Sequence, residues 1–292
     1  MTSELAVSYR AAENIARTRA HNFYYSFVVL PAEKRRALCA VYAFMRLCDD
    51  ISDGAASVES KREMLRAWRA RLAACLAGDL RGNAILPAFH DAVRKFSIPA
   101  EHFHGIIDGA EMDLTIDSYQ TFEDLYKYCF NVASSVGLVC LQIFGYHQER
   151  AKKYAELCGI AFQLTNILRD VKEDAAMGRI YLPREDLERF NYSPEELQHA
   201  IIDERFRRLM TFEASRARDY YVQARHLLPL IEETSRPALW AMMEIYERIL
   251  KKIIRKQYDV FGRSIRLSNP EKATIALRAL AMRFIPGGIG LR

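Results

Sequence analysis

The sequence predicts an all-α protein, and three observations carry this prediction. The chain of 292 residues has only 13 glycines and 9 prolines, so long stretches lack helix-breaking residues. Apolar residues recur along these stretches at three- and four-residue spacing, which is the pattern of an amphipathic helix. The alternation typical of strands is hard to find. Because no linker or low-complexity segment divides the chain, we expect one domain over residues 1–292.

Each expected helix lies between segments that favour turns. The helices are predicted at 32–53, 58–77, 83–96, 100–115, 121–144, 150–174, 204–228, 236–260 and 270–283. Glycine, proline, serine and asparagine mark the breaks, as at Gly78, Gly145 and Gly178. Ser193 precedes Pro194 and two glutamates, which indicates a helix N-cap followed by proline at the first helical position.

The composition is that of an ordinary globular protein and excludes several classes. Half of the residues are hydrophobic, 27% are charged and the net charge is +5. Acidic residues are interspersed with the basic ones and no long basic run occurs, so we expect no nucleic-acid partner. The N-terminal segment has no apolar signal-peptide core. We therefore expect a cytoplasmic protein, which its pI of about 8.8 would allow to dwell peripherally at the inner face of a membrane.

The six cysteines do not suggest a metal or redox centre. They stand far apart in apolar surroundings, at Cys39, Cys48, Cys75, Cys129, Cys140 and Cys158. None belongs to a Cys-x-x-Cys pair, which argues against zinc, iron–sulfur and thioredoxin-type sites. We expect reduced, buried thiols.

Two predicted helices end in acidic residues that share one face. At 100° per residue, the first face groups side chains within about 60° of one another; they are Tyr42, Arg46, Asp49 and Asp53. The second face holds Gln163, Asn166, Asp170 and Asp174. Carboxylates one turn apart at a helix C-terminus repel each other and the helix dipole. Magnesium relieves such repulsion and bridges carboxylates to phosphates; the alternative is two solvated acidic helix ends.

Three further segments stand out between and around the acidic helices. Residues 128–137 concentrate small side chains, which allow either close helix packing or room for a ligand. In residues 178–183, Gly178 presents Arg179 beside an aromatic residue. Residues 22–27 contain four aromatics, as core-packing segments also do.

Together these segments resemble the squalene/phytoene synthase family, which condenses two prenyl diphosphates head to head. The matching elements are 23–27, 42–46, 49–53, 128–137, 163–174 and 178–183, with a looser match near Tyr246 and 258–266. They occur in the family's order and span most of the chain. The resemblance implies a class I isoprenoid synthase bundle whose aspartate helices face each other across a central apolar cavity.

The resemblance also implies roles for individual residues. The metal-ligand positions of the family fall on Asp49, Asp53, Asn166, Asp170 and Asp174. Diphosphate contacts are expected at Arg46, Arg169, Arg179 and Arg263. Tyr128 would take up or relay a proton, and with the four aspartates it forms the expected catalytic set. The expected lining of the substrate site is Phe23, Tyr42, Val132, Val136, Gln163 and Tyr246.

The reaction implied by the resemblance is the magnesium-dependent condensation of two farnesyl diphosphates to presqualene diphosphate or squalene. The alternative is condensation of two geranylgeranyl diphosphates to phytoene, or formation of dehydrosqualene. Two or three Mg²⁺ ions would stabilise the departing diphosphate and leave a carbocation in a water-poor cavity. NADPH is implied only if squalene is the product, and no NADPH-binding motif is present. The expected partners are the allylic substrates and a membrane surface for product release, while the oligomeric state is not predicted.

Other classes explain less of the sequence. A di-iron carboxylate bundle needs two Glu-x-x-His pairs, and only residues 196–199 fit, directly after a helix N-cap. A non-catalytic helical binding protein leaves both acidic faces unexplained. The glycines at 287–290 lack the preceding strand and following helix of a nucleotide-binding loop.

Overall fold

The computed structural model describes residues 3–20 and 22–283. Within these residues the regular secondary structure is helical, apart from isolated bridges between Ser118 and Ile180 and between Tyr146 and Ile231. The predicted all-α fold is confirmed. The glycine-rich segment at 287–290 lies outside the described residues.

Each helix that the sequence predicts has at least one counterpart among the α-helices. In chain order they are α1 (Ser3–Arg19), α2 (Tyr24–Phe27), α3 (Ala32–Ser52), α4 (Val58–Leu76), α5 (Leu86–Lys95), α6 (Ala100–Met112), α7 (Phe122–Cys129), α8 (Ser135–Phe144), α9 (Ala151–Ala176), α10 (Arg184–Arg189), α11 (Pro194–Gln198), α12 (Glu204–Ala224), α13 (Arg236–Arg255) and α14 (Asn269–Met282). Three short helices of other types join them: η1 (Phe130–Ser134), η2 (Arg225–Leu230) and η3 (Glu233–Ser235).

Several predicted helix ends are wrong, and local turns explain why. The helix expected at 83–96 begins at Leu86, because the Asn83 side chain accepts a hydrogen bond from the Ile85 amide and holds a turn. The helix expected to reach 260 ends at Arg255, since Gln257 and Tyr258 take positive φ angles of 51° and 62°. The helix expected at 100–115 ends at Met112, and the one expected at 204–228 becomes the 3₁₀ helix η2 after Ala224.

The predicted helix at 121–144 is interrupted in its middle. Residues Phe130–Ser134 form the π-helix η1 between α7 and α8. Glycines on two neighbouring helices bring their backbones against it. A Cβ on Gly109 would lie 2.5 Å from Val132 Cγ1, and one on Gly159 would lie 2.6 Å from Ser134 Cα. The small residues of this region therefore serve close packing, and Ala133 and Gly137 also leave room for a cavity.

The helix α1 was not predicted from the sequence, because the side chains on its buried face are few and mostly small. Its buried residues are Ser8, Tyr9, Ala12 and Ala16, which give little apolar contrast. The N-cap at Ser193 is confirmed: Ser193 and Glu196 form a capping box at the start of α11.

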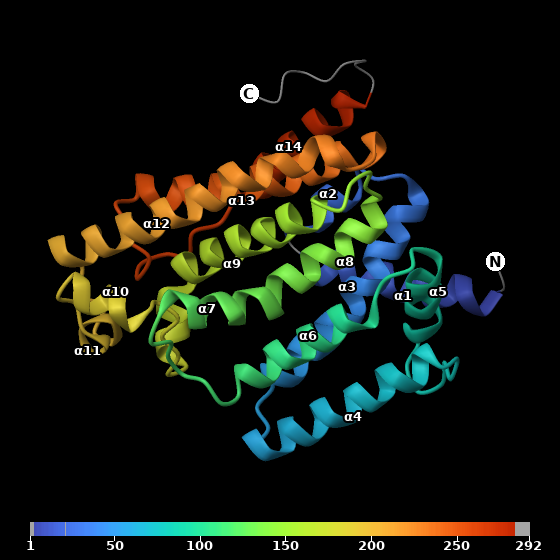
Figure 1. Cartoon of the computed structure of the whole chain (residues 1–292), viewed down its shortest axis with the longest axis horizontal. Coiled ribbons are helices and arrows are strands. Elements are labelled where there is room, and N and C mark those ends of the chain that lie inside the picture. The colour runs from blue at the N-terminus through green and yellow to red at the C-terminus, as the bar shows by residue number, and fades with distance from the viewer. Residues whose placement is uncertain (1–2, 21, 284–292) are drawn as a thin grey trace.

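The helix α9 forms the centre of the bundle. It packs against α12 and α13 on one side and against η1 and α8 on the other, as Figure 1 shows. The helix α3 contacts α1, α5, α6 and α8, while α4 lies at the periphery. This arrangement places the C-terminal ends of α3 and α9, which carry the two aspartate motifs, on opposite sides of a common space.

The cysteines and the most apolar segment belong to this core. All six cysteines are free, and every one except Cys140 is fully buried, as expected. Residues Phe122–Phe144 are long and apolar enough to cross a membrane by length and composition, but half of their most apolar window is buried within the bundle.

Candidate active site

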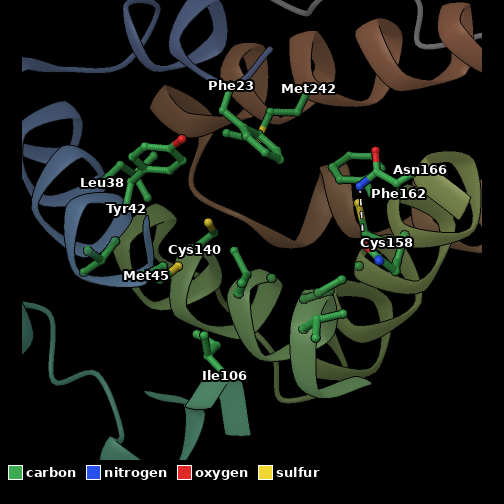
Figure 2. Close-up of a pocket in the computed structure, with 18 of the residues that line it drawn as sticks. Phe23, Leu38, Tyr42, Met45, Ile106, Cys140, Cys158, Phe162, Asn166 and Met242 are labelled. Carbon is green, nitrogen blue, oxygen red and sulfur yellow. Dashed lines mark hydrogen bonds between the residues drawn. The ribbon is translucent and has the colours of Figure 1, made fainter. Parts of the chain in front are cut away.

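An apolar cavity of about 360 Å³ lies at the centre of the bundle. Figure 2 shows its walls: Leu38, Tyr42 and Met45 come from α3, Cys158, Phe162 and Asn166 from α9, and Met242 from α13. The expected apolar cavity is thus present. Most of the predicted site residues line it, namely Phe23, Tyr42, Asp49, Asp53, Tyr128, Val132, Val136, Gln163, Asn166 and Tyr246.

The first aspartate motif forms the polar end of this cavity on α3. The Arg46 guanidinium binds Asp50 at 2.6 Å and lies 3.9 Å from carboxylate oxygens of both Asp49 and Asp53. The tip of the Asp49 side chain is exposed. Desolvation by the protein around this carboxyl group raises its pKa to about 7; the charge of Arg46 opposes the rise and the charge of Asp53 adds to it. A cation placed here would relieve that electrostatic cost.

The residues of the second aspartate motif, on α9, line two different cavities. Asn166 lines the central cavity and donates a hydrogen bond to Gln163 at 3.3 Å. Asp170 lies in a second cavity of about 990 Å³ and forms a bidentate ion pair with Arg169. Asp174 borders the same second cavity, and burial together with the charge of Asp170 raises its pKa to about 7.

Asp113, at the end of α6, lines the cavity and was not predicted from the sequence. Asp113 accepts hydrogen bonds from Tyr128 at 3.2 Å and from Tyr181 at 2.7 Å. Burial raises the pKa of Asp113 while both hydrogen bonds and nearby Arg179 lower it. Burial also raises the pKa of Tyr128 well above its usual value. The sequence carries no motif at Asp113, so only the packing of α6 beside α7 reveals it.

Three of the four predicted arginines, Arg46 included, line neither cavity. Arg179 stands beside Tyr181 and Asp174 in a small crevice next to the second cavity. Arg263 is exposed and lines neither cavity. Arg266, three residues later, does line the second cavity and was not singled out from the sequence.

The donors around the two cavities suit a divalent cation that also binds a ligand. In residues 3–20 and 22–283, no group of three or more His, Cys, Asp or Glu side chains is arranged to hold a metal by itself. The available donors are carboxylate and amide oxygens, which magnesium prefers. The buried Oδ1 atom of Asn166 accepts no hydrogen bond from the described residues. The donor set thus fits magnesium that completes its shell with ligand oxygens.

The fold is an all-α bundle whose apolar cavity has one end lined by carboxylates. A family model described as squalene/phytoene synthase matches residues 16–271. The chain therefore belongs to the squalene/phytoene synthase family and is a prenyltransferase.

Full-length relatives and solved structures agree with this assignment. The chain is 40% identical over 282 residues to a phytoene synthase of Mycobacterium tuberculosis, covering 96% of this chain and 92% of the relative. It is 36% identical over 271 residues to a 15-cis-phytoene synthase of Synechococcus elongatus, covering 89% and 88%. A dehydrosqualene synthase structure superposes with a TM-score of 0.88 at 29% identity, covering 95% and 97%. A squalene synthase from Alicyclobacillus acidocaldarius gives 0.82 at 28%, covering 88% and 97%.

Proposed function

We propose that this chain condenses two molecules of geranylgeranyl diphosphate to phytoene and releases both diphosphates. The observation that carries this proposal is the 40% and 36% identity, over nearly the whole of both chains, to proteins named phytoene synthases. The structures named for C30 products are more distant, at 28–29% identity. The C20 alternative is therefore better supported than the farnesyl diphosphate reaction that the sequence alone favoured. Because phytoene formation involves no reduction, the proposal needs no NADPH.

Condensation of farnesyl diphosphate is the second candidate. It is favoured by the TM-score of 0.88 with the dehydrosqualene synthase, which covers 95% of this chain. The same aspartates and tyrosines would serve either substrate, so the two candidates differ only in the length of the bound chains.

The polar end of the site would bind magnesium and diphosphate together. In this proposal Asp49 and Asp53 on one side, and Asn166, Asp170 and Asp174 on the other, hold the ions. Bound magnesium would neutralise the charge that develops on the leaving diphosphate. Arg46 and Arg169 stand beside these aspartates, where they can bind diphosphate oxygens once the metal takes over the carboxylates.

In this proposal Asp113, Tyr128 and Tyr181 would remove a proton from the coupled chains. A phenol with a strongly raised pKa is a poor base by itself. Tyr128 can instead accept a proton while it passes its own to the Asp113 carboxylate, to which it is already hydrogen-bonded. Tyr181 holds the other oxygen of that carboxylate in place.

The apolar walls would protect the cationic intermediate. Along the cavity the ring of Phe162 stacks on that of Tyr246 with centroids 4.4 Å apart, and the ring of Phe23 lies tilted against Tyr246 at 5.5 Å. Such faces stabilise a nearby cation, and the surrounding aliphatic side chains exclude water. The product is insoluble in water, so we expect its release at a membrane surface, for which a net charge of +5 favours anionic lipid.

An assay of diphosphate release tests the proposal. With magnesium and geranylgeranyl diphosphate, we expect two diphosphates per phytoene, with no effect of NADPH and complete inhibition by EDTA. If the protein releases no diphosphate from either the C15 or the C20 donor, the proposed function is wrong.

A further inference from the structure

The central cavity has one polar end and one apolar end. Along α3 its lining residues run from Asp53 to Leu38, and along α9 from Asn166 to Ala155. At a rise of 1.5 Å per residue these stretches correspond to about 22 Å of α3 and about 16 Å of α9. Two independent helices thus lead from polar residues to an apolar end, which is called the floor below.

One aromatic residue dominates this floor. The lining residues at the apolar end are Leu38, Leu141, Phe144, Ala155, Leu227 and Leu239. All except Phe144 are aliphatic, and Phe144 is 2% exposed. It is the last residue of α8, so its ring lies where the chain turns away from the cavity.

Polar contacts below the floor hold the backbone of Phe144 in place. Its carbonyl oxygen accepts hydrogen bonds from Lys34 Nζ at 2.7 Å and from Ser235 Oγ at 2.8 Å. Lys34 also pairs with Glu232 at 2.6 Å. The next residue, Gly145, has a φ of 72°, and a Cβ there would collide with the Glu232 carboxylate. The position of the ring is therefore tied to the N-terminal ends of α3 and α13.

We infer that Phe144 sets the length of the prenyl chain that the cavity accepts, and that Lys34 is its positioning residue. This inference rests on the proposed function only in taking a C20 chain as the natural donor. One isoprene unit adds four bonds, or about 5 Å, to an extended chain, and a phenyl ring reaches about 4 Å beyond its Cβ. Removal of the ring therefore opens the floor by roughly one isoprene unit.

The test compares kcat/KM for C15, C20 and C25 prenyl diphosphates in wild type and in Phe144→Ala. We expect the C25-to-C20 ratio of kcat/KM to rise about tenfold or more, because an apolar pocket distinguishes substrates that differ by one isoprene unit by at least this factor. Met242→Ala is the matched control, since it removes a side chain of similar size from the wall rather than the floor. We expect the control to change all donors in parallel.

Three further variants test the same floor from other directions. Ala155→Leu fills it and should shift the preference toward C15. Lys34→Met leaves the ring in place but frees the carbonyl below it, so the C25-to-C20 ratio should rise, and Lys34→Arg should restore most of the wild-type ratio. A merely structural role for Lys34 predicts an unchanged ratio in both.

An unchanged C25-to-C20 ratio in Phe144→Ala would overturn the inference, provided that circular dichroism shows a folded protein. If that variant does not fold, Phe144→Leu, which removes less of the side chain, is tested in its place, and an unchanged ratio overturns the inference in the same way. Failure of the proposed function gives a different result, namely a wild-type protein that prefers the C15 donor. In that case the C20-to-C15 ratio of the same variants tests the role of Phe144. Donor affinities from quenching of intrinsic fluorescence give these ratios without turnover.

Discussion

Two aspartates at the polar end of the cavity lie where a negative charge is unfavourable. Asp49 and Asp174 stand near the C-terminal ends of α3 and α9, where the helix dipole disfavours negative charge. Both have a pKa raised to about 7, while ordinary surface aspartates of the same chain, such as Asp124, have a lowered one. The two positions are therefore suited to a cation rather than to structural stability.

Magnesium binding should depend on pH in a defined direction. Below pH 7 Asp49 and Asp174 become protonated. The ionised fraction of each, which is the form that binds metal, then falls about tenfold per pH unit. A carboxyl group whose pKa is raised in the folded state stabilises the protein at low pH and loses that contribution as the pH rises through 7. We therefore expect magnesium with a diphosphate ligand to raise the melting temperature strongly at pH 8 and weakly at pH 6. Thermal scans at the two pH values check this, and an equal shift at both would contradict it.

Asp170→Asn tests the second acidic face. We expect loss of turnover by about 100-fold or more with the fold intact, because a metal ligand is lost. Glu63→Gln, at an exposed position on the peripheral helix α4, is the control and should keep full activity. Diphosphate release and circular dichroism measure both properties. Full activity in Asp170→Asn would remove the metal assignment.

Asp113→Asn tests the proton path. The substitution keeps the size of the side chain but removes the base to which Tyr128 is hydrogen-bonded. We expect kcat to fall about 100-fold, as for loss of a general base, with little change in KM. Steady-state kinetics measure both, and a rise in KM alone would show that Asp113 serves binding instead.

At the scale of elements, glycines allow the helices of the cavity wall to pack closely against one another. The backbones of η1 and α9 meet where Gly159 faces Ser134. We expect Gly159→Ala to destabilise the fold by about 1–3 kcal/mol, because its Cβ would meet backbone atoms that cannot turn away. Gly105→Ala is the milder control, since its Cβ would approach the Ser135 hydroxyl, which can rotate. Urea denaturation compares the two, and equal stability would contradict this account.

The elements that the sequence predicted well are those with strong periodicity. The helices α3, α4 and α9 begin and end within two residues of expectation, because long apolar stripes and turn residues define them. The π-helix η1 was not foreseen, since its register depends on glycines of α6 and α9 that lie far away in sequence.

The candidate site follows the same rule. Residues within contiguous motifs, such as Asp49 and Asn166, were predicted and do line the cavity. Asp113 and Arg266 were missed, because each belongs to the site only through the packing of a separate segment. Local spacing therefore identified residues that line the cavity, while the proposed proton path and the second cavity required the fold.

In the whole molecule, the directions of the helices place apolar residues at one end of the cavity and the aspartates at the other. The helices α3, α9 and α13 begin near the apolar floor, and α8 ends there, whereas the aspartate motifs lie at the opposite ends of α3 and α9. A substrate with an anionic head and a long apolar tail matches this polarity. In our proposal, the length of the tail that fits above the floor decides between C20 and C15 donors.

A competition experiment tests the central claim most directly. Purified protein receives equal concentrations of farnesyl and geranylgeranyl diphosphate with magnesium and without NADPH, and mass spectrometry identifies the hydrocarbon formed. The account predicts C40 phytoene as the main product. Presqualene diphosphate or a C30 hydrocarbon as the main product, with geranylgeranyl diphosphate unconsumed, would contradict it.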